Sequence, residues 1–144
     1  MPEYEKMARI FHAHGKLMAV HMDGRLNVLK DLIAQTSIDI IEAFHPPPMG
    51  DLPLAEALQV WKEKAIWMGF PGAIYEIGSI EVKKYLLDLL RTIGTGERLV
   101  IEMSTENLVS NEHLVLLTSI MENIDLPLTK AKIDRIEKAL ASFP

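Results

Sequence analysis

The chain of 144 residues contains no cysteine. This absence excludes disulfide bonds, thiolate metal sites and a cysteine nucleophile. It is compatible with a reducing cytoplasm, which is where we expect the protein to be located. No apolar run approaches the roughly 20 residues that a membrane-spanning helix needs. The charged N-terminus, residues 2–6, lacks the apolar segment of a signal peptide.

Basic residues are in the minority, with 15 Lys and Arg against 20 Asp and Glu and a formal net charge of -5. This balance, without a basic stripe interleaved with aromatic residues, argues against nucleic acid and anionic membranes as partners. A Gly-rich phosphate loop, a nucleophile elbow and a metalloprotease helix motif are also absent. The hydrophobic content of 49% is sufficient for a core, and we expect residues 1–144 to form one domain.

Short apolar runs alternate with amphipathic helical patterns along the chain. The pattern predicts a leading helix in residues 1–15, four strand–helix units in residues 16–126 and a closing helix in residues 127–144. The predicted strands are residues 17–22, 38–44, 65–70 and 98–103. Near-continuous apolar strands that alternate with helices are typical of a parallel sheet buried on both faces. The predicted fold class is therefore α/β, and only residues 73–77 remain open between strand and loop.

Ionisable residues lie at or near the C-terminal ends of three predicted strands: His21, Glu42 and Glu102. The loops that follow add further polar residues, namely Asp23, His45, Asp51, Ser104, Thr105 and Glu106. Because the C-terminal ends of parallel strands meet at one edge of a sheet, we expect these side chains to converge there. An imidazole together with carboxylates can act as general acid and base, or bind a divalent metal.

Most of these residues also have a structural interpretation. A histidine such as His21 is commonly a hydrogen-bonded rim residue, and Asp23 and Asp51 are placed to cap the helices that follow them. His45 precedes three prolines and is compatible with simple exposure. Glu42 differs from them, because a carboxylate within an apolar run is costly to bury unless it is paired.

Several motifs in this order resemble the C-terminal half of the uroporphyrinogen decarboxylase-like superfamily. They are Val20-His21-Met22-Asp23-Gly24, Asp39-Ile40-Ile41-Glu42-Ala43-Phe44, Pro46-Pro47-Pro48-Met49-Gly50-Asp51 and Leu54-Ala55-Glu56-Ala57. Residues 65–70 and 99–107 fit later strands of the pattern, and the resemblance covers residues 4–123. The superfamily, which includes the decarboxylase and cobamide-dependent methyltransferases, folds as a (β/α)8 barrel. The resemblance implies half of such a TIM barrel, with its last four strand–helix units.

The resemblance implies metal-assisted methyl transfer or decarboxylation at an incomplete site, because the arginines and the catalytic acid of the decarboxylase belong to the other half. It implies catalytic roles for His21 and Glu42. The residues it implies for substrate binding are His45, Asp51, Glu102 and Glu106. The methyltransferases bind zinc through a His-x-Cys pair and a later cysteine. His21-Met22-Asp23 keeps the histidine but replaces the cysteine, which implies a divalent metal held by His21 and Asp23 with harder ligands.

The alternative function is a non-catalytic half-barrel module that oligomerises or binds a small molecule. Half a barrel leaves unpaired edges on the strands predicted in residues 17–22 and 98–103, together with an uncovered inner face. We therefore expect a homodimer or higher oligomer, or association with a separate N-terminal half-barrel. A flatter sheet that is covered on both sides by its own helices would instead be a monomer.

Overall fold

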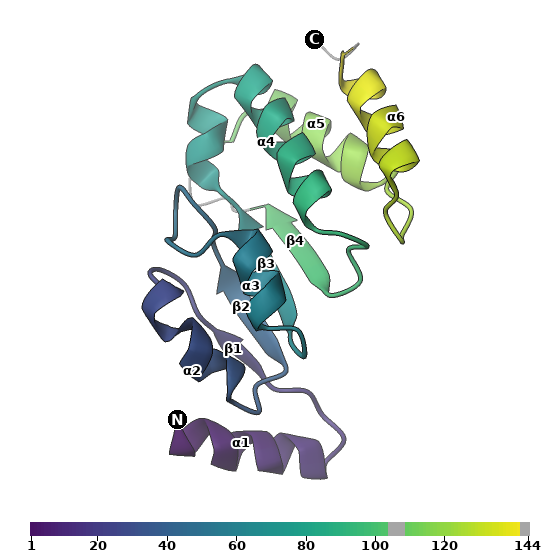
Figure 1. The fold of residues 1–144 in the computed structure, drawn as a ribbon. Coiled ribbons are helices and arrows are strands. Elements are labelled where there is room, and N and C mark those ends of the chain that lie inside the picture. Colours follow the sequence, from purple (N-terminus) through teal and green to yellow (C-terminus); the bar gives the residue numbers. More distant parts are fainter. Residues whose placement is uncertain (104–108, 142–144) are drawn as a thin grey trace. The chain divides into compact units, whose positions relative to one another are not determined.

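The computed structural model describes residues 1–103 and 109–141 (Figure 1). The described chain forms two compact units, one comprising residues 1–71 with 98–103 and the other residues 72–97 with 109–141. Within these residues, none of the helices combines the length and apolar character that crossing a membrane requires. The expectation of a single domain over residues 1–144 stays a prediction.

The first unit contains a parallel sheet of four strands in the order β1-β2-β3-β4. Its strands are β1 (Ala19–His21), β2 (Ile40–Phe44), β3 (Ala65–Phe70) and β4 (Leu99–Met103). Its helices are α1 (Pro2–Ala13), the short 3-10 helix η1 (Asn27–Leu29), α2 (Lys30–Ala34) and α3 (Leu54–Val60). Strands and helices alternate as predicted, so the α/β fold class is confirmed.

One face of this sheet is covered, with α2 and α3 lying in front of it in Figure 1. Ile41, Ile66 and Met68 are fully buried, whereas Trp67, between the last two in β3, is 39% exposed. This alternation is what a strand produces when successive side chains point to opposite faces. The helices contribute Trp61, which follows α3 and packs edge-on against Phe44 with the ring centroids 5.5 Å apart. The core of this unit therefore lies between the sheet and its helices.

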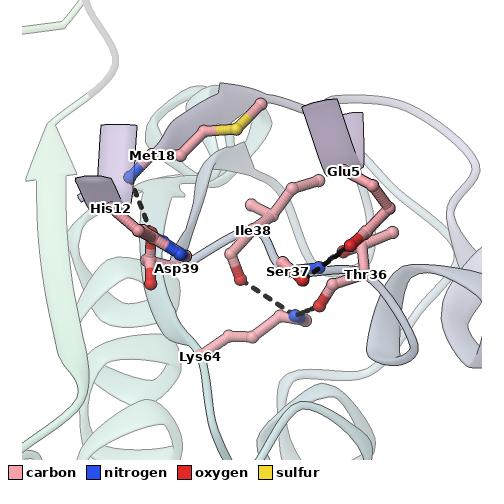
Figure 2. Close-up of polar contacts among 8 residues, drawn as sticks. All are labelled: Glu5, His12, Met18, Thr36, Ser37, Ile38, Asp39 and Lys64. Carbon is pink, nitrogen blue, oxygen red and sulfur yellow. Dashed lines mark hydrogen bonds and ion pairs between the residues drawn. The ribbon is translucent and has the colours of Figure 1, made fainter. Parts of the chain in front are cut away.

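Helix α1 is attached to the N-terminal end of the sheet by two carboxylates (Figure 2). Asp39, just before β2, accepts hydrogen bonds from the backbone N–H of Met18 at 2.7 Å and from Nε2 of His12 at 2.8 Å. Glu5 of α1 accepts bonds from the backbone N–H and the hydroxyl of Ser37, at 2.8 and 2.7 Å. Both bonds from Ser37 lower the pKa of the Glu5 carboxyl. Each carboxylate thus links α1, or the segment after it, to the start of β2.

Lys64 lies in the same region with a side chain that is almost fully buried. Its ammonium donates to the carbonyl oxygens of Thr36 and Ile38, at 2.6 and 2.9 Å (Figure 2). Burial lowers the pKa of Lys64, and the negative charges of Asp39 and Glu5 oppose that shift. Burial alone would raise the pKa of Asp39, but the bonds from Met18 and His12, together with nearby positive charge, outweigh it and the pKa is lowered. This end of the sheet carries a structural ionic network.

The second unit contains η2 (Gly72–Glu76), α4 (Ser79–Thr92), α5 (Asn111–Met121) and α6 (Lys130–Ala141). The segment that the sequence left undecided, residues 73–77, lies largely in the 3-10 helix η2. Ser110 caps α5, because its hydroxyl oxygen accepts the backbone N–H of His113 at 3.1 Å. An ion pair of 2.9 Å between Arg91 and Glu137 joins α4 to α6.

The prediction that Asp23 caps the helix after β1 was wrong. That helix begins later than expected, at Asn27 in the 3-10 turn and at Lys30 in α2, and neither start has a side-chain cap of its own. The backbone N–H of Asn27 instead donates to Oδ1 of Asp51 at 3.0 Å. Asp51 does not cap α3, whose N-cap is Pro53. A carboxylate 24 residues away thus binds an N–H in the first turn of this helix.

Candidate acid–base site

The site is organised around a hydrogen bond between His21 and Glu42. His21 is the last residue of β1, and Glu42 is the middle residue of β2. The two residues are register partners on adjacent parallel strands, so their side chains leave the same face of the sheet. Nδ1 of His21 lies 2.7 Å from Oε2 of Glu42. The imidazole side chain is 67% exposed, whereas the carboxylate side chain is 28% exposed. Of the predicted site residues, these two are brought into direct contact.

This bond determines which ring nitrogen of His21 is available for chemistry. When the carboxylate accepts this bond, the neutral imidazole has its proton on Nδ1. Nε2 then keeps its lone pair and has no hydrogen-bond partner among the described residues. A nitrogen in this state can take a proton from a substrate or bind a metal ion. Glu42 orients the ring and stabilises the imidazolium form when Nε2 is protonated.

A β-bulge lies directly after Glu42. The register between β2 and β3 shifts between Ile41 and Phe44, and Ala43 in the bulge has a φ of 58°. This left-handed conformation costs a residue with a side chain about 1–2 kcal/mol. Bulges of this kind occur beside active sites, where they change the direction of a side chain. Here the bulge ends the regular pairing of β2 immediately after the carboxylate.

His45 folds back onto the C-terminal end of the sheet. Its Nδ1 lies 2.9 Å from the carbonyl oxygen of Ala43 in the bulge. Its Nε2 lies so close to Gly69 of β3 that a Cβ atom at that position would be 2.2 Å away. Only glycine leaves room there for the imidazole. The half-buried ring of His45 is therefore held by the bulge on one side and by β3 on the other.

Glu102 is paired with a residue that the sequence did not single out. Oε2 of Glu102 accepts a hydrogen bond of 2.8 Å from Nε1 of Trp67. Trp67 pairs with Val100 in register, and Glu102 pairs with Gly69, so all four lie on the same face of the sheet as Glu42. No sequence signal singled out Trp67, because an indole within the apolar run Ile66-Trp67-Met68 is equally consistent with a buried strand residue.

The remaining predicted residues lie apart from this pair or outside the described structure. Asp51 is engaged with the backbone of Asn27. Asp23 is exposed in the loop after β1, and its side chain makes no hydrogen bond or ion pair with the described residues. Glu106 lies outside the described residues, as do Ser104 and Thr105. The role in substrate binding suggested for Asp51 and Glu106, and the metal role of Asp23, stay predictions.

The described residues contain no group of three or more His, Asp and Glu side chains placed to hold a metal ion. His21 with Asp23 supplies at most two protein ligands, whereas catalytic zinc sites use three and leave one position open. A cation bound here would need further ligands from water, substrate or another chain. Acid–base chemistry requires only the His21–Glu42 pair itself, and the geometry therefore fits that chemistry more directly.

Comparisons of the chain with protein-family models, with curated proteins and with solved structures gave no match.

Proposed function

We propose that the chain is a half-barrel of the uroporphyrinogen decarboxylase-like superfamily and that His21 is its acid–base residue. The His21–Glu42 hydrogen bond is the observation that carries this proposal. It orients the ring so that Nε2 faces away from the carboxylate, and it lies on strands whose C-terminal ends form the usual catalytic edge of a barrel. The reaction class that follows from the resemblance is decarboxylation or methyl transfer on a small molecule.

In this proposal Nε2 of His21 moves the proton, and Glu42 is a positioning residue that acts through the imidazole. His45 and Glu102 lie near the C-terminal end of the same sheet and are proposed to contact the substrate. His45 is held against Gly69, and Glu102 is oriented by the indole of Trp67. In a metal-assisted version of this site, Nε2 of His21 would bind a divalent cation. Glu42 would then orient the histidine ligand through its hydrogen bond to Nδ1.

We expect His21→Ala to lower turnover on methyl donors or tetrapyrroles by about 10²–10⁴-fold, the usual contribution of a general acid or base. Glu42→Gln should lower it less, by about 10–100-fold, because the imidazole remains but loses its orienting partner. Turnover and divalent-metal binding by calorimetry would be measured on the same samples. His14→Ala is the matched control, because His14 is exposed and bonds only to a carbonyl of its own helix.

Equal turnover by wild type and His21→Ala would contradict the assignment of the acid–base residue. If the wild type neither binds a divalent metal nor turns over any of these substrates, the enzymatic proposal is abandoned. The non-catalytic half-barrel then becomes the better description.

A second candidate function, that of a half-barrel module completed by a second copy, is supported by the sheet itself. Strands β1 and β4 each have one neighbour in the sheet, so each has an edge without a strand partner in the described structure. The face that bears the site is apolar in part, with Trp67 39% and Val100 50% exposed. Because β1 and β4 run in the same direction, β1 of one copy can pair with β4 of another in parallel, and two copies would close one barrel.

We expect the chain to have a solution mass twice its 16.2 kDa when measured by light scattering at micromolar concentration. Val100→Lys should convert this dimer to a monomer, because it would place a charge inside the shared core. Val115→Lys is the matched control, since Val115 is at least as exposed, at 57% against 50%, but lies on α5 in the second unit. A wild-type monomer would contradict the dimer and leave a separate N-terminal half-barrel as the expected partner.

A further inference from the structure

The second unit contains a groove between α5 and α6 that plays no part in the site described above. Its volume is about 370 Å³, and it lies along the last turn of α5, the connecting loop and one side of α6. This volume is within the range of sites that bind small molecules, about 300–1,000 Å³. All of its lining residues belong to this one unit.

The wall of the groove is mainly aliphatic. Ile120 of α5, Leu128 of the loop and Leu140 of α6 line it and are buried. Ile124 and Ile136 complete the wall and are half-buried. These five side chains are all branched and aliphatic, and none of them is aromatic. Such a surface suits a flexible hydrocarbon chain, because moving the chain out of water onto it is favourable.

The charged groups of the groove carry an excess of positive charge. Lys132, Arg135 and Asp125 line it, which gives two cations and one carboxylate. The ammonium of Lys132 donates to the carbonyl oxygens of Asp125 and Pro127, at 2.8 and 3.1 Å. The guanidinium of Arg135 has no hydrogen bond or ion pair within residues 1–103 and 109–141. Arg135 is therefore the group available to bind an anion beside the aliphatic wall.

We propose that this groove binds an amphipathic monocarboxylate, with the hydrocarbon chain against Ile120, Ile124 and Ile136 and the carboxylate on Arg135. A guanidinium matches a carboxylate in geometry as well as in charge. A small molecule suits the groove better than a protein partner does, because a stable protein interface buries at least about 1,000 Å². The proposal is independent of the His21–Glu42 site, which lies in the first unit.

The probe for this proposal is octanoate below its micellar concentration, with binding to the whole chain measured by calorimetry. We expect saturable binding of octanoate, weaker binding of 1-octanol and no binding of octylammonium. Arg135→Gln should raise the dissociation constant for octanoate about fivefold, the upper range for an exposed ion pair. Ile136→Glu should abolish binding, because it places a carboxylate in the wall. Lys138→Gln is the matched control: Lys138 lies on the same helix but does not line the groove.

Methyl chemical shifts of Ile120, Ile124 and Ile136 would locate the bound chain, and thermal melts would show that each variant is folded. The proposal is overturned if octanoate shifts none of these methyl groups, or if Arg135→Gln and Lys138→Gln bind it equally well. It is also overturned if Ile136→Glu changes the solution mass, because the groove would then be covered by a second copy. Equal binding of octanoate and 1-octanol would also overturn it, because the carboxylate would then contribute nothing to binding at Arg135.

Discussion

Replacing Trp61 by alanine is expected to lower the free energy of unfolding of the first unit by about 4 kcal/mol. The indole is fully buried, packs edge-on against Phe44, and donates from Nε1 to the carbonyl oxygen of Lys30 at 2.9 Å. Truncation would leave a cavity between helices and sheet and remove this hydrogen bond. Urea unfolding followed by tryptophan fluorescence reports on this unit, because both tryptophans lie in it.

Trp67→Ala is the matched control for this prediction. It removes the same side chain from the same sheet, but at a position that is 39% exposed and loses only one exposed hydrogen bond, to Glu102. In the Val100→Lys background, in which no second copy is expected to cover this face, we expect a loss of about 1 kcal/mol or less. If Trp67→Ala in that background cost as much as Trp61→Ala, the core of the unit would lie on the other face of the sheet.

Gly50→Ala is expected to destabilise the first unit by about 3 kcal/mol or more, the upper range for overpacking a dense interior. A Cβ atom at Gly50 would lie 2.0 Å from the carbonyl oxygen of His45 and 3.1 Å from that of Gly24. Both contacts are with backbone, which cannot rotate away as a flexible side chain can. The loop that holds His45 against Gly69 would have to move. The measurement is again urea unfolding, combined with the imidazole NMR signals of His45.

Gly15→Ala separates this steric effect from backbone strain. Gly15 has a φ of 64°, but a Cβ atom there would meet nothing within 4 Å. The expected cost is therefore only that of the left-handed conformation, about 1–2 kcal/mol, with no change in the signals of His45. If Gly50→Ala were no more destabilising than Gly15→Ala, the close approach of Gly50 to the His45 carbonyl would be excluded.

The alternation of strands and helices was determined by the sequence alone, because it is encoded by local patterns. The predicted strand over residues 65–70 coincides with β3. The leading helix, predicted in residues 1–15, ends just before Gly15, which has the left-handed φ of 64° typical of a helix end. Each of these features depends on residues within a few positions of one another. The parallel direction of the sheet followed from the same alternation.

Contacts between distant segments were decided only by the tertiary structure. Asp51, predicted to cap the helix after it, binds Asn27 on an earlier segment, and Trp67 reaches Glu102 from 35 positions away. The sequence predicted that His21 and Glu42 share an edge of the sheet, but their hydrogen bond depends on the register of β1 against β2. Register is a property of the packed sheet, since a shift of one residue moves a side chain to the opposite face. For this protein, local periodicity therefore determined which elements form, and packing determined which of their polar groups meet.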